Sequence, residues 1–209
     1  ASGKELFVDV ELPGRMVRVK VWQAKVGHVR LYMLDTDVPG NSDADRGIAH
    51  RLYGGDRKTR LEQEIVLGVG GVRALEALGH QPTVWHSNEG HAAFQVLERA
   101  RIAIAKHGLD FATAIEAVAA NTVFTTHTAV PAGHDHFAED MVRHYFEQWC
   151  QEVGASADQL VALPGDDASK NGLTVWPGTA AMYIPKSLEG DKLDAAKKPI
   201  EFATTQQGC

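Results

Sequence analysis

Two short apolar segments constrain the fold of this chain most strongly. Residues 82–85 and 121–126 each have the composition of a buried strand, and each runs into a polar loop that carries a histidine. Two helical patterns, at 91–106 and 110–120, separate them. Strands that alternate with helices predict an α/β fold with a parallel sheet. Such sheets place their chemistry at the carboxyl ends of the strands, so the two histidine loops are the first candidates for a site.

The N-terminal residues predict a small antiparallel sheet. Residues 6–12 and 16–22 alternate between apolar and polar side chains, and Pro13-Gly14 between them is a turn signal. A third apolar run follows at 29–34. Alternation with a period of two buries one face of each strand, so we expect a β-meander over residues 1–37.

A long helix is predicted at 57–78, where apolar side chains recur at a period near 3.6. A short helical or irregular piece precedes it at 46–53. Gly68, Gly70 and Gly71 each lower helix propensity by about 1 kcal/mol relative to alanine. They match no phosphate-binding spacing, so we interpret them as sites of close packing against a neighbouring element.

The C-terminal part of the chain changes character. Residues 139–153 form an amphipathic pattern that predicts one more helix. From residue 177 onward no period is sustained, and we expect an irregular tail of low order. The predicted division is therefore a β-meander portion at 1–37, an α/β portion at 38–176 and an atypical tail at 177–209.

Composition narrows the class of partner. The 209 residues carry a net charge of −6 with acids and bases interspersed, and no Lys/Arg block offers a face to nucleic acid. No window approaches the roughly 18 apolar residues of a membrane-spanning helix. The two cysteines, Cys150 and Cys209, do not make a disulfide framework. We therefore expect a cytoplasmic protein that binds neither nucleic acid nor membrane.

Ten histidines raise the question of a metal site. His127, His134, Asp135, His136 and His144 could supply ligands for zinc or iron. Their spacing fits no familiar ligand pattern and HEXXH is absent, so we predict no metal site. The simpler interpretation is a set of polar loop residues that cap the following helix.

The other polar loops leave two interpretations open. The acid and imidazole of Asn88-Glu89-Gly90-His91 could orient sugar hydroxyls or transfer protons, or could cap the helix that follows. Thr126-His127-Thr128 suits hydrogen bonds to a polyol and suits a strand end equally well. Gly54-Gly55-Asp56 could be a mobile gate that carries a carboxylate, although such a triplet is more often a turn.

Three motifs, in this order, carry a resemblance to a known family. They are RLYGGDR at 51–57 with RLEQE at 60–64, WHSNEGHAAF at 85–94, and VFTTHTAVPAGHD at 123–135. These residues resemble the α-glucan (glycogen, starch, maltodextrin) phosphorylases, and most closely their bacterial and archaeal branch. The resemblance covers residues 5–170 and indicates an internal fragment of the family's N-terminal domain.

The resemblance implies a fold, an activity and a cofactor. The fold is a pair of Rossmann-like domains of the glycosyltransferase-B type, with the site in the cleft between them. The activity is phosphorolysis, in which phosphate removes the terminal glucose of an α-1,4-glucan and releases glucose 1-phosphate. Pyridoxal phosphate acts through its phosphate group as an acid–base partner, and its lysine belongs to the second domain, so no cofactor residue is expected here. The resemblance also suggests an allosteric homo-oligomer.

The resemblance implies a role for several individual residues. His127 matches the histidine whose ring and carbonyl contact the transferred glucosyl unit. Asp56, implied as catalytic together with His127, matches the acid of a loop that gates the cleft and lies near the glucosyl ring. The residues implied for glucan binding and its support are Asn88, Glu89, His91 and Thr128.

The resulting expectation is a partial phosphorylase that contributes the glucan side of the site and is inactive alone. Two alternatives stay open. One is a non-catalytic glucan-binding module. The other is a metal-dependent hydrolase built on His127, His134 and His136.

Overall fold

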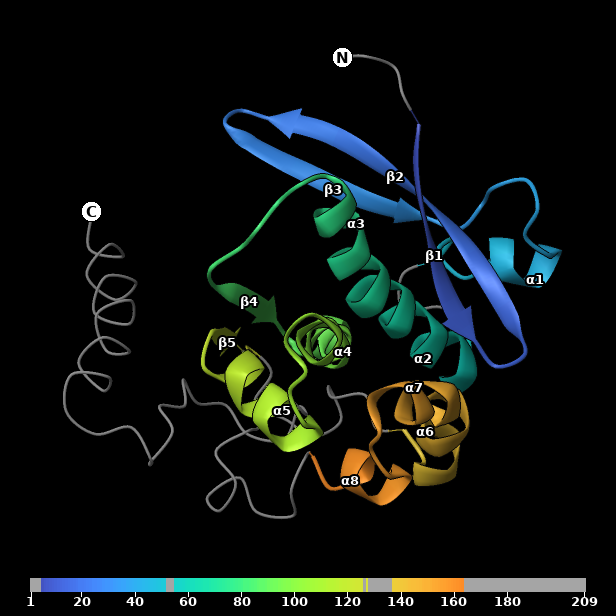
Figure 1. Ribbon diagram of the computed structural model, residues 1–209. Helices are drawn as coiled ribbons and strands as arrows, with labels where there is room; N and C mark the ends of the chain where they lie inside the picture. The colour runs from blue at the N-terminus through green and yellow to red at the C-terminus, as the bar shows by residue number, and fades with distance from the viewer. Residues whose placement is uncertain (1–4, 52–54, 126, 128–136, 164–209) are drawn as a thin grey trace.

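The computed structural model describes residues 5–51, 55–125, 127 and 137–163. It contains an antiparallel sheet, a parallel pair of strands and helices that pack between and around them (Figure 1). No helix in this part of the chain is long and apolar enough to cross a membrane. The tail predicted at 177–209 lies outside these residues, so the proposed division of the chain stays a prediction.

Strands β1 (Leu6–Leu12), β2 (Arg15–Val26) and β3 (Val29–Asp35) form the antiparallel sheet in that order, which confirms the predicted β-meander. Gly14 and Gly27 adopt positive φ at the two hairpin turns, a conformation that carries no steric penalty for glycine. Pairing places alternate valines on one face of the sheet. The buried members are Val8, Val10, Val17 and Val19.

A single helical turn, α1 (Asp43–Arg46), follows the sheet. It lies slightly earlier than the irregular or helical piece predicted at 46–53. The Ser42 hydroxyl oxygen accepts the backbone N–H of Asp45 at 3.2 Å, and this cap sets where the turn begins. Residues 47–50 are turns.

The long helix predicted at 57–78 forms, with one interruption. α2 (Arg57–Ile65) runs into a π-helical turn, η1 (Val66–Gly70), and then into α3 (Gly71–Ala77). The three pieces pack under the sheet, where η1 contacts both β1 and β3. A π-helical turn inside an α-helix is a local defect that the apolar period does not reveal.

The close packing predicted for the helix glycines is confirmed at two of the three positions. A β-carbon on Gly68 would lie 2.7 Å from the backbone nitrogen of Gln95. A β-carbon on Gly70 would lie 3.2 Å from Cγ2 of Val10. A β-carbon on Gly71 would meet no atom within 4 Å, so the packing interpretation is wrong for Gly71.

The parallel pair confirms the predicted α/β class. β4 (Trp85–Asn88) pairs in parallel with β5 (Thr122–Thr125). The sequence predicts the first strand at 82–85, three residues too early. Residues 82–84 are exposed and precede the ladder with β5.

The connection between these strands is helical. It comprises a 3₁₀ turn, η2 (Gly90–Ala92), then α4 (Gln95–His107) and α5 (Phe111–Ala119). The helix predicted from residue 91 begins at Gln95 because the 3₁₀ turn takes up the preceding residues.

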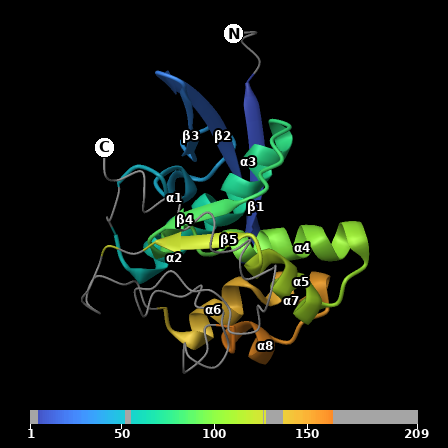
Figure 2. The same ribbon diagram turned by 90° about the vertical axis from the view of Figure 1, so that its left-hand side faces the viewer.

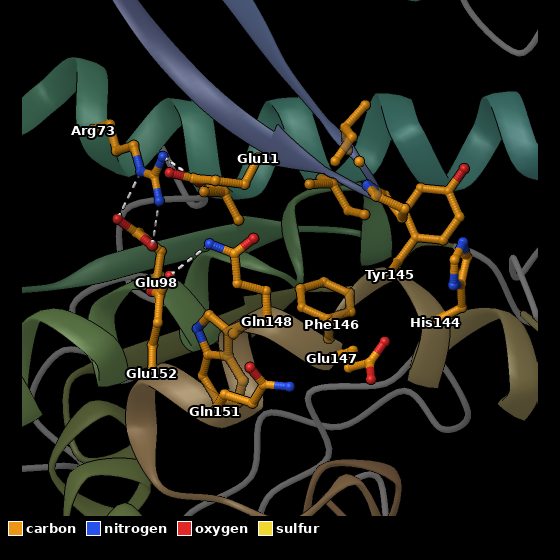
Figure 3. A pocket seen from close by; sticks show the side chains of 16 residues that line it. Glu11, Arg73, Glu98, His144, Tyr145, Phe146, Glu147, Gln148, Gln151 and Glu152 are labelled. Atoms are coloured by element: carbon orange, nitrogen blue, oxygen red, sulfur yellow. Dashed lines mark hydrogen bonds and ion pairs between the residues drawn. The ribbon is translucent and has the colours of Figure 1, made fainter.

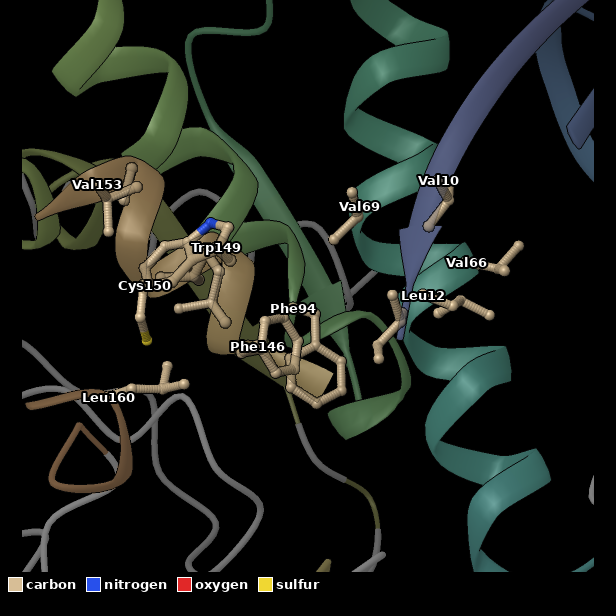
Figure 4. Packing of buried hydrophobic residues seen from close by; sticks show 14 of the residues in the cluster. Val10, Leu12, Val66, Val69, Phe94, Phe146, Trp149, Cys150, Val153 and Leu160 are labelled. Carbon is tan, nitrogen blue, oxygen red and sulfur yellow. The ribbon is translucent and has the colours of Figure 1, made fainter. Parts of the chain in front are cut away.

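Three short helices complete the described chain: α6 (Glu139–Tyr145), α7 (Glu147–Val153) and α8 (Ala157–Val161). The single helix predicted at 139–153 is therefore broken, at Phe146, whose φ is −110°. Phe146 is 3% exposed, and the centroid of its ring lies 4.9 Å from that of Phe94. Figure 4 shows this pair between α7 and the end of β1, where it joins the C-terminal helices to the core.

Candidate functional site

The carboxyl ends of the two parallel strands lie side by side, as the α/β pattern predicts. Asn88 ends β4 and pairs with Thr125, which ends β5. The backbone N–H of Glu89 donates to the carbonyl of Thr125 at 2.8 Å and extends the pairing by one residue. The labels β4 and β5 in Figure 2 mark the two strands running together. His127 follows two residues beyond β5.

Asn88, Glu89 and His127 form one hydrogen-bonded group, here called the strand-end cluster. Nε2 of His127 lies 2.9 Å from the amide oxygen of Asn88. Since that oxygen only accepts, Nε2 carries the proton, and Nδ1 of a neutral ring is an acceptor. One carboxylate oxygen of Glu89 accepts the backbone N–H of His127 at 2.5 Å. The cluster therefore fixes both the ring and the backbone of an exposed histidine.

Glu89 holds an unusual backbone conformation. Its φ is 61° and its ψ is −178°, and among the described residues it is the one non-glycine residue with positive φ. This region of conformational space is nearly restricted to glycine and costs a side-chain-bearing residue about 1–3 kcal/mol. The backbone bond to Thr125 holds the residue there and directs its carboxylate toward His127.

The capping interpretation of this turn is wrong. Neither η2 nor α4 has a side-chain hydrogen bond at its N-cap. The carboxylate of Glu89 instead reaches across to the loop after β5. The site interpretation of the turn stays a prediction.

A buried chain of polar side chains, which the motifs do not predict, packs against β4. Gln95 donates to the hydroxyl of Ser87 at 2.8 Å, and Arg99 donates to the side-chain oxygen of Gln95 at 3.1 Å. Arg99 also donates to the hydroxyl of Thr122 at 2.8 Å. Burial lowers the pKa of Arg99 to about 10. The spacing of Gln95 and Arg99, four residues apart, was the available signal.

Two other predicted residues lie on or against α2. Nδ1 of His91 is 3.4 Å from a guanidinium nitrogen of Arg60 and 4.0 Å from a carboxylate oxygen of Glu64. The carboxylate of Asp56 caps the start of α2 and accepts the backbone N–H of Thr59 at 2.9 Å. The backbone N–H and the hydroxyl of Thr59 hold the pKa of Asp56 below its usual range. Thr128 lies outside the described residues.

The proposed metal ligands do not meet in the part of the chain that is described. There, no three histidine, cysteine, aspartate or glutamate side chains gather as a metal site. His144 packs edge-on against the ring of Tyr145, and His127 belongs to the strand-end cluster. His134, Asp135 and His136 lie outside the described residues.

The four lysines among the described residues do not fit a Schiff base with pyridoxal phosphate at this cluster. Lys25, Lys58 and Lys106 are exposed, and Lys20 pairs with Glu5. No described lysine shares a hydrogen bond or ion pair with Asn88 or His127.

A cavity of about 710 Å³ lies away from the cluster, between α7, the β1–β2 turn and the α2–α3 helix (Figure 3). Its lining includes Arg73, Glu98 and Trp149 but none of the three cluster residues. At the strand-end cluster itself, Asn88 and His127 are exposed and Glu89 is partly buried.

No protein-family model matches the chain. Relatives do match it. A glycogen phosphorylase of Mycobacterium tuberculosis is 44% identical over 179 residues, covering 80% of this chain and 21% of that protein. A maltodextrin phosphorylase of Thermococcus litoralis is 47% identical over 183 residues, which cover 88% of this chain and 22% of that protein. A glycogen phosphorylase of Aquifex aeolicus is 38% identical over 186 residues, which cover 88% of this chain and 27% of that protein.

Among solved structures, the catalytic domain of starch synthase IV from Arabidopsis thaliana, bound to ADP and acarbose, has a TM-score of 0.46 at 14% identity. The match covers 75% of this chain and 27% of that one. The chain spans only 21–27% of the length of the relatives named above. Over that share of their length, it belongs to the α-glucan phosphorylase family.

Proposed function

We propose that this chain contributes the glucan side of an α-glucan phosphorylase site, within one of the family's Rossmann-like domains. The complete enzyme would use phosphate to cleave an α-1,4-glucan and release glucose 1-phosphate. One observation carries the proposal: Asn88 and Glu89 fix the ring and backbone of His127 at the carboxyl ends of two parallel strands. Open α/β sheets bind their ligands at this edge.

The fixed histidine suits a sugar whose charge changes during the reaction. With its Nε2 proton donated to Asn88, the ring of His127 offers an acceptor at Nδ1 to a sugar hydroxyl. The bond from Glu89 fixes the backbone at His127, whose carbonyl dipole would stabilise an oxocarbenium-like glucosyl unit. A preorganised dipole of this kind needs no rearrangement when the charge develops.

Three residues take secondary roles in the proposal. Asp56 would approach the glucosyl unit from the gate loop, beside Gly55, whose φ is 90°. His91 would line the acceptor side from its place against α2. Thr128 would support the glucan through its hydroxyl.

Pyridoxal phosphate would supply acid–base chemistry to the substrate phosphate in the complete enzyme. Because the described lysines do not fit its Schiff base, we place that cofactor on other residues and expect no turnover from this chain alone. We propose a cytoplasmic location, as for an enzyme of intracellular glucan metabolism.

Calorimetry with maltodextrin tests the proposal. We expect binding that weakens at least about tenfold in His127→Ala and in Asn88→Ala, which removes the partner of the ring. His107→Ala, an exposed histidine in the last turn of α4, is the control and should bind normally. Binding that survives both cluster variants would favour a glucan-binding module that uses another surface.

A second assay addresses turnover and the metal alternative. The chain is incubated with maltodextrin, phosphate and pyridoxal phosphate, and glucose 1-phosphate is measured. Robust turnover would contradict the expected inactivity. Zinc or iron in elemental analysis of the purified chain, lost in His127→Ala, would favour the hydrolase instead.

A further inference from the structure

The ring of His91 lies between a buried ion pair and the surface. His91 belongs to the 3₁₀ turn η2, which packs against α2. Its side chain is 32% exposed, whereas that of Glu64 on α2 is 5% exposed. Nδ1 of His91 lies 3.4 Å from Nη2 of Arg60 and 4.0 Å from the carboxylate of Glu64. The partner that Nδ1 takes decides which nitrogen of the neutral ring carries the proton.

Arg60 is held in place by two residues of its own helix. Nη1 donates to the side-chain oxygen of Gln63 at 3.2 Å, and Nη2 donates to the carboxylate of Glu64 at 3.4 Å. Residues three and four positions apart are neighbours on one face of a helix. The side chain of Arg60 is 12% exposed. These contacts therefore set the orientation of the guanidinium before any ligand binds.

The amide of Gln63 is itself fixed by the chain that precedes α2. Its nitrogen donates to the backbone carbonyls of Ile48 at 2.8 Å and of Arg51 at 2.9 Å. Because carbonyl oxygens only accept, the amide nitrogen faces these residues and the amide oxygen faces Arg60. A chain of directed hydrogen bonds therefore runs through Gln63 and Arg60 to His91.

This chain determines the tautomer of His91. A guanidinium group only donates, and Nη2 carries two N–H groups, enough for both Glu64 and His91. Nδ1 of His91 is therefore an acceptor, and the proton of the neutral ring is on Nε2. The carboxylate of Glu64 would favour the opposite tautomer, but at 4.0 Å it is beyond hydrogen-bond distance.

We propose that Arg60 is a positioning residue, which fixes His91 as a hydrogen-bond donor at Nε2 toward the glucan. This inference rests on the proposed function and deepens it. The ring oxygen and the glycosidic oxygen of a glucan only accept hydrogen bonds, and its hydroxyl groups can accept as well as donate. His91 donates where His127 accepts through Nδ1, so the two histidines bind glucan oxygens in complementary ways.

Nitrogen-15 NMR of the histidine rings tests the tautomer. The His91 signals are identified by their loss in His91→Gln. In the native chain, at alkaline pH, where an ordinary histidine is neutral, we expect the proton on Nε2. Arg60→Met removes the donor and leaves Glu64 beside Nδ1, so the proton should move to Nδ1. Lys58→Met removes an exposed cation from the same helix and should leave the tautomer unchanged.

Calorimetry with maltodextrin tests the consequence for binding. Arg60→Met should weaken binding roughly three- to tenfold, which corresponds to the loss of one hydrogen bond. Lys58→Met should bind as tightly as the native chain. Circular dichroism checks that both variants remain folded. The native spectrum decides the tautomer even if Arg60→Met does not fold.

The two measurements separate this proposal from the proposed function. A proton on Nδ1 in the native chain, or a tautomer that Arg60→Met leaves unchanged, would overturn the proposal even if maltodextrin binds normally. A chain with the proton on Nε2 that binds no maltodextrin would contradict the proposed function. Arg60 would then position the ring of His91, but the donation to glucan would be overturned.

Discussion

At the scale of single residues, Glu89 combines backbone strain with a directed contact. Its φ of 61° disfavours any side chain, while its carboxylate holds the backbone N–H of His127. Two substitutions separate the cost of the backbone strain from the contribution of the contact. Glu89→Gly and Glu89→Ala both remove the carboxylate, but only glycine relieves the strain. We expect the glycine variant to be the more stable of the two by about 1 kcal/mol, measured by urea unfolding.

Both Glu89 variants should lose glucan binding to a similar degree, because neither can fix the His127 backbone. An alanine variant as stable as the glycine variant would mean that the backbone relaxes and that the strain is absent in solution. If the Glu89→Gly variant binds glucan as tightly as the native chain, Glu89 does not belong to the proposed site.

The strand-end cluster shows which part of a site the sequence can reveal. Asn88, Glu89 and His127 follow predicted strands, and the structure joins them because parallel strand ends meet at one edge. The role of Gln95 and Arg99 is hidden, because a spacing of four residues places the two side chains on one helix face but does not show that they contact a strand. The positive φ of Glu89 could not be predicted either, because in a sequence only a glycine indicates that conformation.

At the scale of elements, the glycines in the α2–α3 helix give a matched pair of substitutions. A β-carbon on Gly68 would lie 2.7 Å from the Gln95 nitrogen and 2.9 Å from the Phe94 carbonyl carbon, and neither backbone atom can move cheaply. Gly68→Ala should therefore destabilise the chain by about 1–3 kcal/mol. Gly71→Ala meets no atom and should stabilise it by about 0.5–1 kcal/mol, because alanine loses less backbone freedom on folding.

Thermal and urea unfolding of the two variants measure the difference directly. A Gly68→Ala variant as stable as Gly71→Ala would show that α4 can move away from the helix. Loss of stability in Gly71→Ala would mean that this position packs against residues that the structure does not describe.

The same helix shows why element boundaries escape prediction. The period of the apolar residues predicts a helix at 57–78. It does not show which of Gly68, Gly70 and Gly71 packs against a neighbouring element. The break at Phe146 is likewise hidden, because the apolar pattern at 139–153 continues through it. Boundaries of this kind are set by tertiary contacts, such as the 4.9 Å approach of the Phe146 and Phe94 rings.

At the scale of the whole molecule, one ion network joins the meander to the α/β part. Arg73 of α3 donates to Glu98 of α4 at 2.8 Å and to the carboxylate of Glu11 at 2.5 Å (Figure 3). It also donates to the backbone carbonyl of Asp9 at 2.6 Å. Arg101 donates to the same Glu98 carboxylate at 2.6 Å. The side chain of Glu98 is 0% exposed, so two cations compensate a fully buried charge.

This network predicts a specific dependence of stability on pH. Burial raises the pKa of Glu98, but the hydrogen bonds from Arg101 and Arg73 outweigh burial and leave that pKa below its usual value. A group whose folded pKa is lowered contributes stability above its unfolded pKa, about 4.3 for glutamate, and loses it as pH falls through the folded pKa. Glu98→Gln should cost about 3 kcal/mol near neutral pH, at the low end for breaking a buried pair, because Arg101 loses its ion pair with Glu98 while Arg73 keeps the one with Glu11.

Urea unfolding of the native chain and of Glu98→Gln, followed from neutral to strongly acidic pH, measures the loss of stability and its dependence on pH. The difference between them should shrink below about pH 4, where the native carboxylate takes up a proton that glutamine cannot bind. Glu76→Gln is the control, since its pair with Lys106 also bridges α3 and α4 but is exposed, and it should cost less than about 1 kcal/mol. Equal losses for the two variants, or a difference that persists in acid, would show that the ion pairs of Glu98 do not hold the meander to the helices.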